Sequence, residues 1–151
     1  MHDESRERTA EPSSGWASLQ PGEALGPLRL TVSTEANERY WRAAGADHPR
    51  LRAGALYPPI AANLTILCFQ LTVPDAMIQT RQRLRCHRSV QAGGELVTTG
   101  RVVERYEKRG REYVDIEAHV VTADAPGTPL WDSWVTFTPT AALGRSSGTR
   151  A

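Results

Sequence analysis

The fold is decided by one uncharged stretch of sequence: Tyr57-Pro58-Pro59-Ile60-Ala61-Ala62-Asn63-Leu64-Thr65-Ile66-Leu67-Cys68-Phe69-Gln70-Leu71-Thr72. The stretch is too short to cross a membrane, and polar residues interrupt its apolar positions. Pro58 and Pro59 suit the first turn of a helix, where backbone N–H groups have no intrahelical acceptor, and Pro74 cannot continue a helix. The stretch therefore predicts a buried central helix.

Length and charge bound the class of protein. The chain has 151 residues, the length of one domain, and a formal net charge of +1, which gives no reason to expect nucleic acid or a membrane as a partner. Residues 1–8 are densely charged and lack the apolar segment of a signal peptide, so a cytoplasmic location is expected. Cys68 and Cys86 show no CxxC or Cys/His spacing, which favours reduced thiols. We expect neither a metal nor a redox cofactor.

Both ends of the chain are polar and rich in Ser, Gly or charged residues. We expect residues 1–15 and 140–151 to be disordered tails around a single domain at residues 16–139. Ahead of the central helix, Leu28–Val32 alternates like a short strand. A helix is predicted to follow, with Ser33 or Thr34 as its N-cap and Gly45 as its stop, and residues 45–54 are expected to form a loop.

After Pro74 the chain is predicted to form strands over residues 77–90, 95–107, 113–120 and 130–138. Turns at residues 92–94, 108–111 and 125–127 are expected to join consecutive strands as hairpins. In the last strand, Trp131 and Trp134 should lie on opposite faces. The predicted fold class is α+β, with an antiparallel sheet wrapped around the central helix.

Three local patterns, taken with the order of the elements, carry a family resemblance. They are Val32-Ser33-Thr34-Glu35 through Ala44-Gly45-Ala46-Asp47-His48-Pro49, Tyr57-Pro58-Pro59, and His87-Arg88-Ser89-Val90-Gln91-Ala92-Gly93-Gly94-Glu95-Leu96. The chain resembles the MaoC-like hotdog family of enoyl-thioester hydratases and hydroxyacyl-thioester dehydratases, and in particular its N-terminal-half type with a degenerate catalytic motif. The resemblance covers roughly residues 25–139 and implies a single hotdog fold.

The resemblance also exposes a missing catalytic pair. Active members of the family carry an Asp and, five positions later, a His in the loop before the central helix, and these move protons on the acyl chain. Ala46 and Leu51 stand at the matching positions, and a shift of one residue pairs Asp47 with Arg52, which is not a usable base. Asp47 and His48 are the nearest catalytic substitutes. The alternative is that both are capping or surface residues.

Recognition of the thioester carbonyl is expected at the start of the central helix. The resemblance places a polarising backbone N–H there, at Ile60, Ala61 or Ala62, just past Pro59. Tyr57 either donates its phenol to the same carbonyl, as a third catalytic candidate, or is a half-buried structural residue. Asn63 either contacts substrate or is a satisfied polar group in the core.

Three arginines, Arg81, Arg83 and Arg85, alternate along the strand predicted at residues 77–90, so their side chains should share one face. They either hold a phosphate of pantetheine or of a nucleotide, or form a solvated face paired with neighbouring carboxylates, which is the commoner case. His87 and His119 are interpreted as structural. The candidate substrate-binding residues are thus Pro59, Ile60, Ala61, Asn63, Arg81 and Arg83.

Two functions from different classes remain open. The first is an enzyme that acts on an acyl thioester of coenzyme A or of an acyl carrier protein by dehydration, hydration, or a related addition or cyclisation. The second is a non-catalytic hotdog subunit that binds the acyl chain and dimerises with an active partner. A thioesterase is a weaker third candidate, because no carboxylate occurs in residues 57–72. By analogy with small hotdog domains, a homodimer or a heterodimer with another hotdog subunit is expected.

Overall fold

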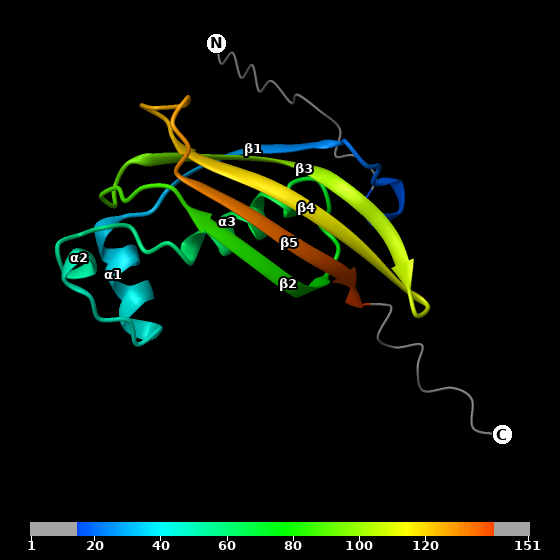
Figure 1. Cartoon of the computed structure of the whole chain (residues 1–151), viewed down its shortest axis with the longest axis horizontal. Helices are drawn as coiled ribbons and strands as arrows, with labels where there is room; N and C mark the ends of the chain where they lie inside the picture. Colours follow the sequence, from blue (N-terminus) through cyan, green and yellow to red (C-terminus); the bar gives the residue numbers. More distant parts are fainter. Residues whose placement is uncertain (1–14, 141–151) are drawn as a thin grey trace, which may run out of the picture.

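The structure is a computed structural model that describes residues 15–140. The predicted tails lie outside the described residues, apart from Gly15 and Thr140. The elements follow the chain in this order (Figure 1): η1 (Trp16–Ser18), β1 (Ala24–Thr31), α1 (Thr34–Ala43), α2 (Pro49–Arg52), α3 (Ile60–Gln70), β2 (Met77–Cys86), β3 (Glu95–Lys108), β4 (Arg111–Thr122) and β5 (Trp131–Pro139).

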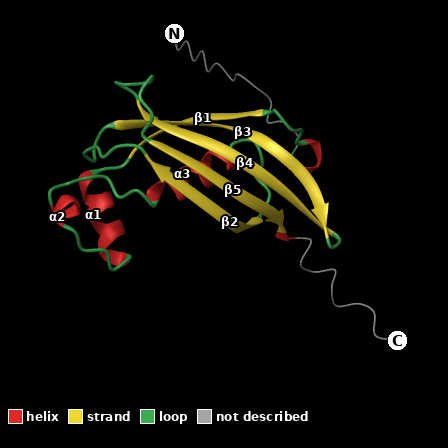
Figure 2. Ribbon diagram, viewed as in Figure 1, coloured by secondary structure: helices red, strands yellow, loops and turns green. Residues whose placement is uncertain are grey.

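The five strands form one antiparallel sheet in the order β1-β3-β4-β5-β2. The sheet curves around α3, while α1 and α2 lie together beyond one end of it (Figure 2). The α+β class and the antiparallel sheet around a central helix are confirmed.

The central helix α3 is buried because most of its faces are apolar. Ala61, Leu64 and Phe69 are each no more than 1% exposed. Pro59 is the N-cap residue, so the prolines precede the helix rather than occupy its first turn. One side of the helix, at Leu67 and Leu71, is left exposed by the described residues.

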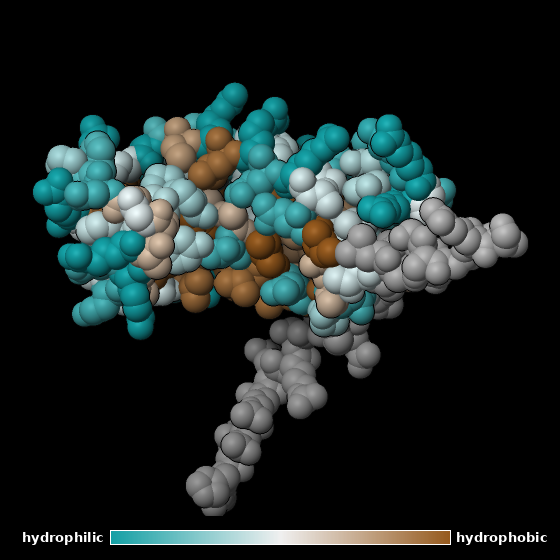
Figure 3. Space-filling view, turned by 90° about the horizontal axis from the view of Figure 1, so that it is seen from below, coloured by the Kyte–Doolittle hydropathy of each residue, from teal (hydrophilic) through white to brown (hydrophobic). Residues whose placement is uncertain are grey.

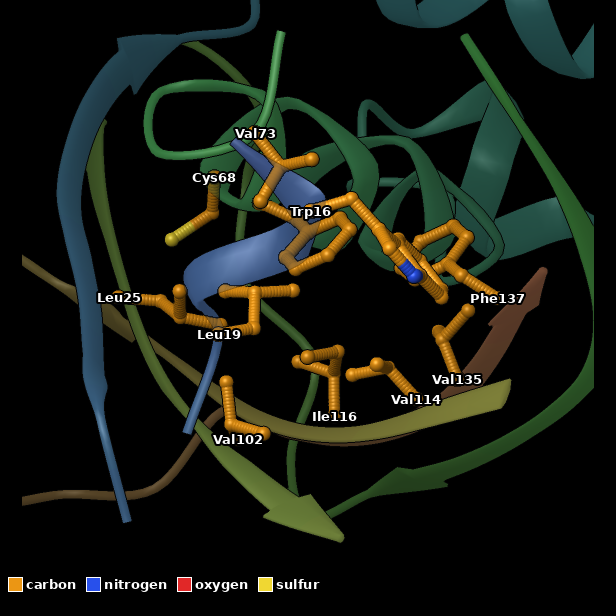
Figure 4. Close-up of a cluster of buried hydrophobic side chains, with 11 residues drawn as sticks. Trp16, Leu19, Leu25, Cys68, Val73, Val102, Val114, Ile116, Val135 and Phe137 are labelled. Atoms are coloured by element: carbon orange, nitrogen blue, oxygen red, sulfur yellow. The ribbon is translucent and has the colours of Figure 1, made fainter. Parts of the chain in front are cut away.

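The core lies between α3 and the concave face of the sheet (Figure 4). Phe69 of α3 stacks on Phe137 of β5, with ring centroids 4.8 Å apart. In β4 the residues Val114, Ile116 and Val120 are buried, as their alternation predicts. Burial of these side chains supplies most of the stabilisation that fixes the sheet on the helix.

The predicted hairpin across residues 87–96 is wrong. β2 pairs with β5 at one edge of the sheet, and β3 pairs with β1 near the other. Strand β2 also ends at Cys86, earlier than expected. The reason is that the segment after β2 bonds elsewhere: the N–H of Leu56 donates to Val90 O at 2.8 Å, and the N–H of Gly93 donates to Val32 O at 2.9 Å. These bonds carry the chain across the end of the sheet instead of reversing it.

Other local predictions can be compared directly with the structure. The side chain of Ser33 caps α1 by accepting the N–H of Ala36 at 3.1 Å. The loop expected at residues 45–54 contains the short helix α2, because His48 caps it and Pro49 starts it. The hairpin between β3 and β4 is confirmed. Its turn places Arg109 and Gly110 at positive φ, the backbone conformation that tight hairpins require.

Candidate functional site

A cavity of about 420 Å³ lies beside the N-terminal end of α3. One wall is the segment from α2 to the start of α3, and the other is the end of β2 with the residues after it. The lining residues are His48, Arg50, Leu51, Ala55, Leu56, Tyr57, Pro58, Cys86, His87, Arg88 and Ser89. Within the part of the chain that the structure describes, this lining includes no carboxylate. The cavity is therefore apolar with a cationic and imidazole-bearing rim.

The predicted pair Asp47 and His48 is split by the structure. Asp47 is exposed, does not line the cavity, and forms an ion pair with Arg52 at 2.9 Å. His48 does line the cavity and caps α2, because its Nδ1 accepts the N–H of Arg50 at 3.1 Å. A neutral His48 in this arrangement carries its proton on Nε2. It is therefore a hydrogen-bond donor rather than a base.

Tyr57 is held in the cavity wall by a buried amide that the sequence analysis did not single out. The backbone N–H of Tyr57 donates to Oδ1 of Asn37 at 2.9 Å, and Nδ2 of Asn37 donates to Ala55 O at 2.9 Å. Asn37 is 1% exposed. The ring of Tyr40 in α1 lies 5.9 Å from the ring of Tyr57, measured between centroids. Asn37 thus ties α1 to the segment that carries Tyr57.

The polarising backbone N–H expected at Ile60, Ala61 or Ala62 has acceptors within its own turn of the chain. The N–H groups of Ile60, Ala61 and Ala62 each donate to the carbonyl three residues earlier, at 3.0–3.1 Å. The side chains of Ile60 and Ala61 are buried in the core, while Pro59 is exposed at the N-cap, and none of the three lines the cavity. The donors that line the cavity itself are therefore side chains.

The remaining predicted binding residues lie outside the cavity lining. Asn63 donates to the hydroxyl of Tyr40 at 2.5 Å. Arg81 and Arg83 project from the outer face of β2, where the guanidinium of Arg83 lies 4.2 Å from the ring centroid of Trp134. Through this cation–π contact Trp134 lies on the outer face of β5, whereas the side chain of Trp131 is buried on the opposite face.

His87, Asp132 and His119 form a hydrogen-bonded cluster that the sequence analysis did not anticipate. Nε2 of His87 lies 2.6 Å from Oδ2 of Asp132, and Nδ1 of His119 lies 2.7 Å from Oδ1. Burial by itself raises the pKa of the Asp132 carboxyl, but the hydrogen bonds from His119 and His87 lower it and prevail. The pKa of Asp132 therefore lies below its ordinary value, which keeps the carboxylate ionised between the two imidazoles.

Of these three residues, only His87 lines the cavity. Because its Nε2 is engaged by the carboxylate, a neutral His87 donates that N–H to Asp132 and carries its lone pair on Nδ1. Within residues 15–140 no hydrogen bond to Nδ1 of His87 is present. A histidine oriented by a carboxylate in this way has the arrangement of a general base.

Cys86 and Arg88 flank His87 in the lining. Partial burial raises the pKa of the Cys86 thiol, which disfavours its thiolate form. Arg88 donates from Nη2 to Oγ1 of Thr122 at 3.0 Å, while its buried Nε has no hydrogen-bond partner among the described residues. Arg88 is also absent from the ion pairs formed within residues 15–140. A half-buried cation of this kind favours an anionic ligand.

Between residues 15 and 140, no three His, Cys, Asp or Glu side chains are placed to hold a metal ion together. In that same range no helix has the length and apolar character that a membrane span requires.

Comparison with solved structures identifies the fold. No protein-family model matches the chain, and no curated protein matches it by sequence. Solved structures do match. The HadBC (3R-hydroxyacyl-ACP dehydratase) complex from Mycobacterium tuberculosis is 22% identical with a TM-score of 0.63, covering 78% of this chain and 96% of that one. R-hydratase PhaJ1 from Pseudomonas aeruginosa is 17% identical with a TM-score of 0.67, covering 82% and 83%.

A MaoC-like dehydratase from Rhodospirillum rubrum is 14% identical with a TM-score of 0.66, covering 84% of this chain and 97% of that one. These three matches each cover at least 78% of this chain. The chain therefore has the hotdog fold of the MaoC-like dehydratases and hydratases.

Proposed function

We propose that this chain acts on acyl thioesters carried by coenzyme A or an acyl carrier protein, by hydration, dehydration or a related addition, in the cytoplasm. One observation carries the proposal. The cavity beside the start of α3 brings together His48, Tyr57 and His87. In this proposal His48 and Tyr57 are hydrogen-bond donors, and His87 is a base that is oriented by a carboxylate. The hotdog fold supports it, because the matched structures include a 3-hydroxyacyl-ACP dehydratase and a hydratase.

The proton carrier in this proposal is His87. In hydration of an enoyl thioester, Nδ1 of His87 takes a proton from water as the water oxygen bonds to C3, and the π electrons move onto the thioester carbonyl to give an enolate. The imidazolium then returns the proton to C2. Dehydration of a 3-hydroxyacyl thioester is the same sequence in reverse. Asp132 holds the ring and stabilises the imidazolium that forms.

Hydrogen-bond donors must stabilise the negative charge that develops on the thioester oxygen. The three N–H groups at the start of α3 already donate within the turn, so the role passes to Nε2–H of His48 and the hydroxyl of Tyr57. The rim cations Arg50 and Arg88 fit the phosphates of the carrier arm, since no carboxylate of the lining competes for them. Arg81 and Arg83 have no part in this proposal, because they do not line the cavity.

The second candidate is a non-catalytic subunit that binds the acyl chain and dimerises with an active partner. A specific observation favours it: Leu51, which occupies the family's histidine position, itself lines the cavity and cannot exchange a proton. Homologous hotdog proteins form heterodimeric complexes, HadBC among them. On this reading the cavity shapes an acyl site whose acid and base come from the partner.

The two candidates are separated by measuring binding and turnover on the same sample. Calorimetric titration with a saturated short acyl-CoA reports binding, and the enoyl absorbance of a short enoyl-CoA or 3-hydroxyacyl-CoA reports turnover. Binding with turnover supports the enzyme. Binding without turnover supports the non-catalytic subunit, and absence of both contradicts the proposal that the cavity takes acyl thioesters.

A further inference from the structure

A pocket of about 300 Å³ lies at the end of the sheet where the β3–β4 hairpin turns. In Figure 1 this end is the one away from α1 and α2. We call it the outer-face pocket, and its lining residues are Thr80, Arg81, Tyr106, Lys108, Arg109, Tyr113 and Thr136. They come from β2, β3, β4, β5 and the hairpin turn. The pocket therefore joins segments that lie far apart in the sequence.

The outer-face pocket opens on the convex face of the sheet, away from α3. Its lining residue Tyr113 alternates in β4 with Val114, which is buried in the core, so the side chain of Tyr113 points outward. The cavity beside α3 lies elsewhere. Arg81 lines the outer-face pocket and Cys86 lines that cavity, and the two residues are roughly 17 Å apart along β2. The pocket and the cavity are therefore separate.

The lining of the outer-face pocket is rich in positive charge. Three of its side chains are exposed cations, Arg81, Lys108 and Arg109. None of them forms an ion pair within residues 15–140. In the space-filling view hydrophilic residues gather at this end of the molecule, whereas apolar residues lie across its middle (Figure 3). The three charges are thus available to an anionic ligand.

Two carboxylates share this face of the sheet but leave the cations unpaired. Asp115 accepts hydrogen bonds from the hydroxyls of Thr136 and Tyr106 at 2.6 and 3.4 Å. Glu104 is the cross-strand neighbour of Asp115 on β3. Neither carboxylate lines the pocket. Within the described part of the chain, the lining therefore keeps three cations that no carboxylate contacts.

Two stacked tyrosines form part of the same lining. The rings of Tyr106 and Tyr113 have centroids 5.4 Å apart. The hydroxyl of Tyr113 enters no hydrogen bond among the described residues, so it can donate to a ligand. Burial raises the pKa of Tyr106, and the charge of Arg81 acts in the opposite direction. The guanidinium on β2 thus reaches electrostatically to the tyrosine on β3 across the pocket.

Arg109 occupies a turn position that favours other residue types. It has a φ of 53° and is followed by Gly110 with a φ of 73°. Hairpin turns with positive φ at both central residues favour Asn, Asp or Gly. An arginine is unfavoured there on conformational grounds, yet its side chain lines the pocket. A ligand contact of the guanidinium would offset that unfavourable backbone conformation.

We propose that the outer-face pocket binds a small diphosphate, either free pyrophosphate or the diphosphate of a nucleotide. Guanidinium groups bind phosphate oxygens through paired N–H donors, and the ammonium of Lys108 adds a point charge. Two linked phosphates match the separation of the cations into Arg81 on β2 and the pair at the hairpin. A volume of about 300 Å³ is at the lower end of pockets that hold small molecules. The proposal goes beyond the proposed function and does not depend on it, because no thioester takes part.

Amide NMR spectra of the isotope-labelled chain, titrated with sodium pyrophosphate, measure the affinity and locate the site. We expect saturable shifts at residues 80–81, 106–113 and 136, which weaken as salt screens the charges. The variant R81Q/R109Q should bind at least about tenfold more weakly. The matched control R39Q/R85Q loses the same charge outside the lining and should bind like the wild-type chain. The spectrum of each variant also reports whether its fold is retained.

Parallel titrations with ADP and with succinate define the ligand. ADP that binds more tightly than pyrophosphate identifies a nucleotide, and ADP that binds no more tightly identifies the diphosphate group alone. Succinate, a dianion without phosphate, should bind at least about tenfold more weakly than pyrophosphate. The proposal is overturned by the absence of saturable shifts at the lining residues, by equal losses in R81Q/R109Q and the control, or by succinate that binds as tightly as pyrophosphate.

Discussion

Nε2 of His87 lies 2.6 Å from Oδ2 of Asp132, although the two residues are 45 positions apart in the chain. The contact exists because β2 pairs with β5, which sets Arg85 opposite Asp132 and leaves His87 just beyond the end of the strand. The carboxylate fixes the imidazole, and the imidazole lines the cavity beside α3. In the proposed mechanism, this one relationship supplies the base that the sequence pattern lacks at residues 46 and 51.

Replacement of His87 should separate chemistry from folding. His87→Gln removes the base but keeps a polar side chain of similar size, so we expect turnover of an enoyl thioester to fall about a hundredfold or more with little change in thermal stability. His119→Gln is the control, since His119 contacts the same carboxylate but does not line the cavity. Steady-state rates of both variants test this, and equal losses in the two would remove His87 from the proposed mechanism.

The low pKa of Asp132 predicts how stability responds to acid. Because the folded state holds this carboxyl below its ordinary pKa, the ionised group stabilises the fold above that ordinary value, and the contribution is lost as the pH falls through the folded-state pKa. Asp132→Asn should therefore be less stable than the wild-type chain at neutral pH. The difference should shrink as the pH drops below about 4. Urea unfolding at a series of pH values measures it, and a difference that does not change with pH would contradict the assignment.

The two cysteines should differ in reactivity. Burial raises the pKa of Cys68 to about 11, outweighing a backbone hydrogen bond that lowers it, and the side chain is 1% exposed. Cys86 is exposed and lines the cavity. At pH 8 we expect a thiol reagent to modify one cysteine in the native protein, Cys86, while Cys68 reacts only on unfolding.

Ligand protection turns this difference into a binding assay. A bound acyl-CoA should slow modification of Cys86, since both occupy the same cavity. Cys86→Ser should abolish the native reaction altogether. Labelling of Cys86 at an unchanged rate with saturating acyl-CoA would show that the thioester binds elsewhere.

Asn37 should matter more for stability than its position on a polar helix suggests. Asn37→Ala leaves the N–H of Tyr57 and the carbonyl of Ala55 without their partner in a buried setting, so we expect a loss of about 2 kcal/mol in the free energy of unfolding. Asn63→Ala removes an exposed hydrogen bond to Tyr40 and should change stability by less than about 0.5 kcal/mol. Chemical denaturation of both variants tests the contrast, which a loss of equal size in the two would refute.

The two longer helices, α1 and α3, and the strand faces were predictable because they depend on local patterns. The apolar run around Leu64 specifies α3, and the alternation through Val114 and Ile116 specifies the inner face of β4. The fold class followed from the order of these elements. The cap of α1 at Ser33 was also predictable from the sequence, since its hydroxyl accepts a hydrogen bond from the backbone N–H only three residues away.

Strand neighbours and the site were not predictable in the same way. Alternation states which face a residue occupies but not which strand lies beside it, so the pairing of β2 with β5 was missed. Without that pairing, nothing in the sequence joins His87 to Asp132. Asn37 was missed for a similar reason, because its acceptor and donor lie in a segment 18–20 residues further on.

The most direct test of the account is the enoyl absorbance of a short enoyl-CoA mixed with the purified chain, read against the His87→Gln variant under the same conditions. The account predicts hydration by the wild-type chain and its near loss in the variant. An unchanged absorbance with the wild-type chain, despite saturated binding of the thioester, would contradict the claim that this cavity performs the chemistry.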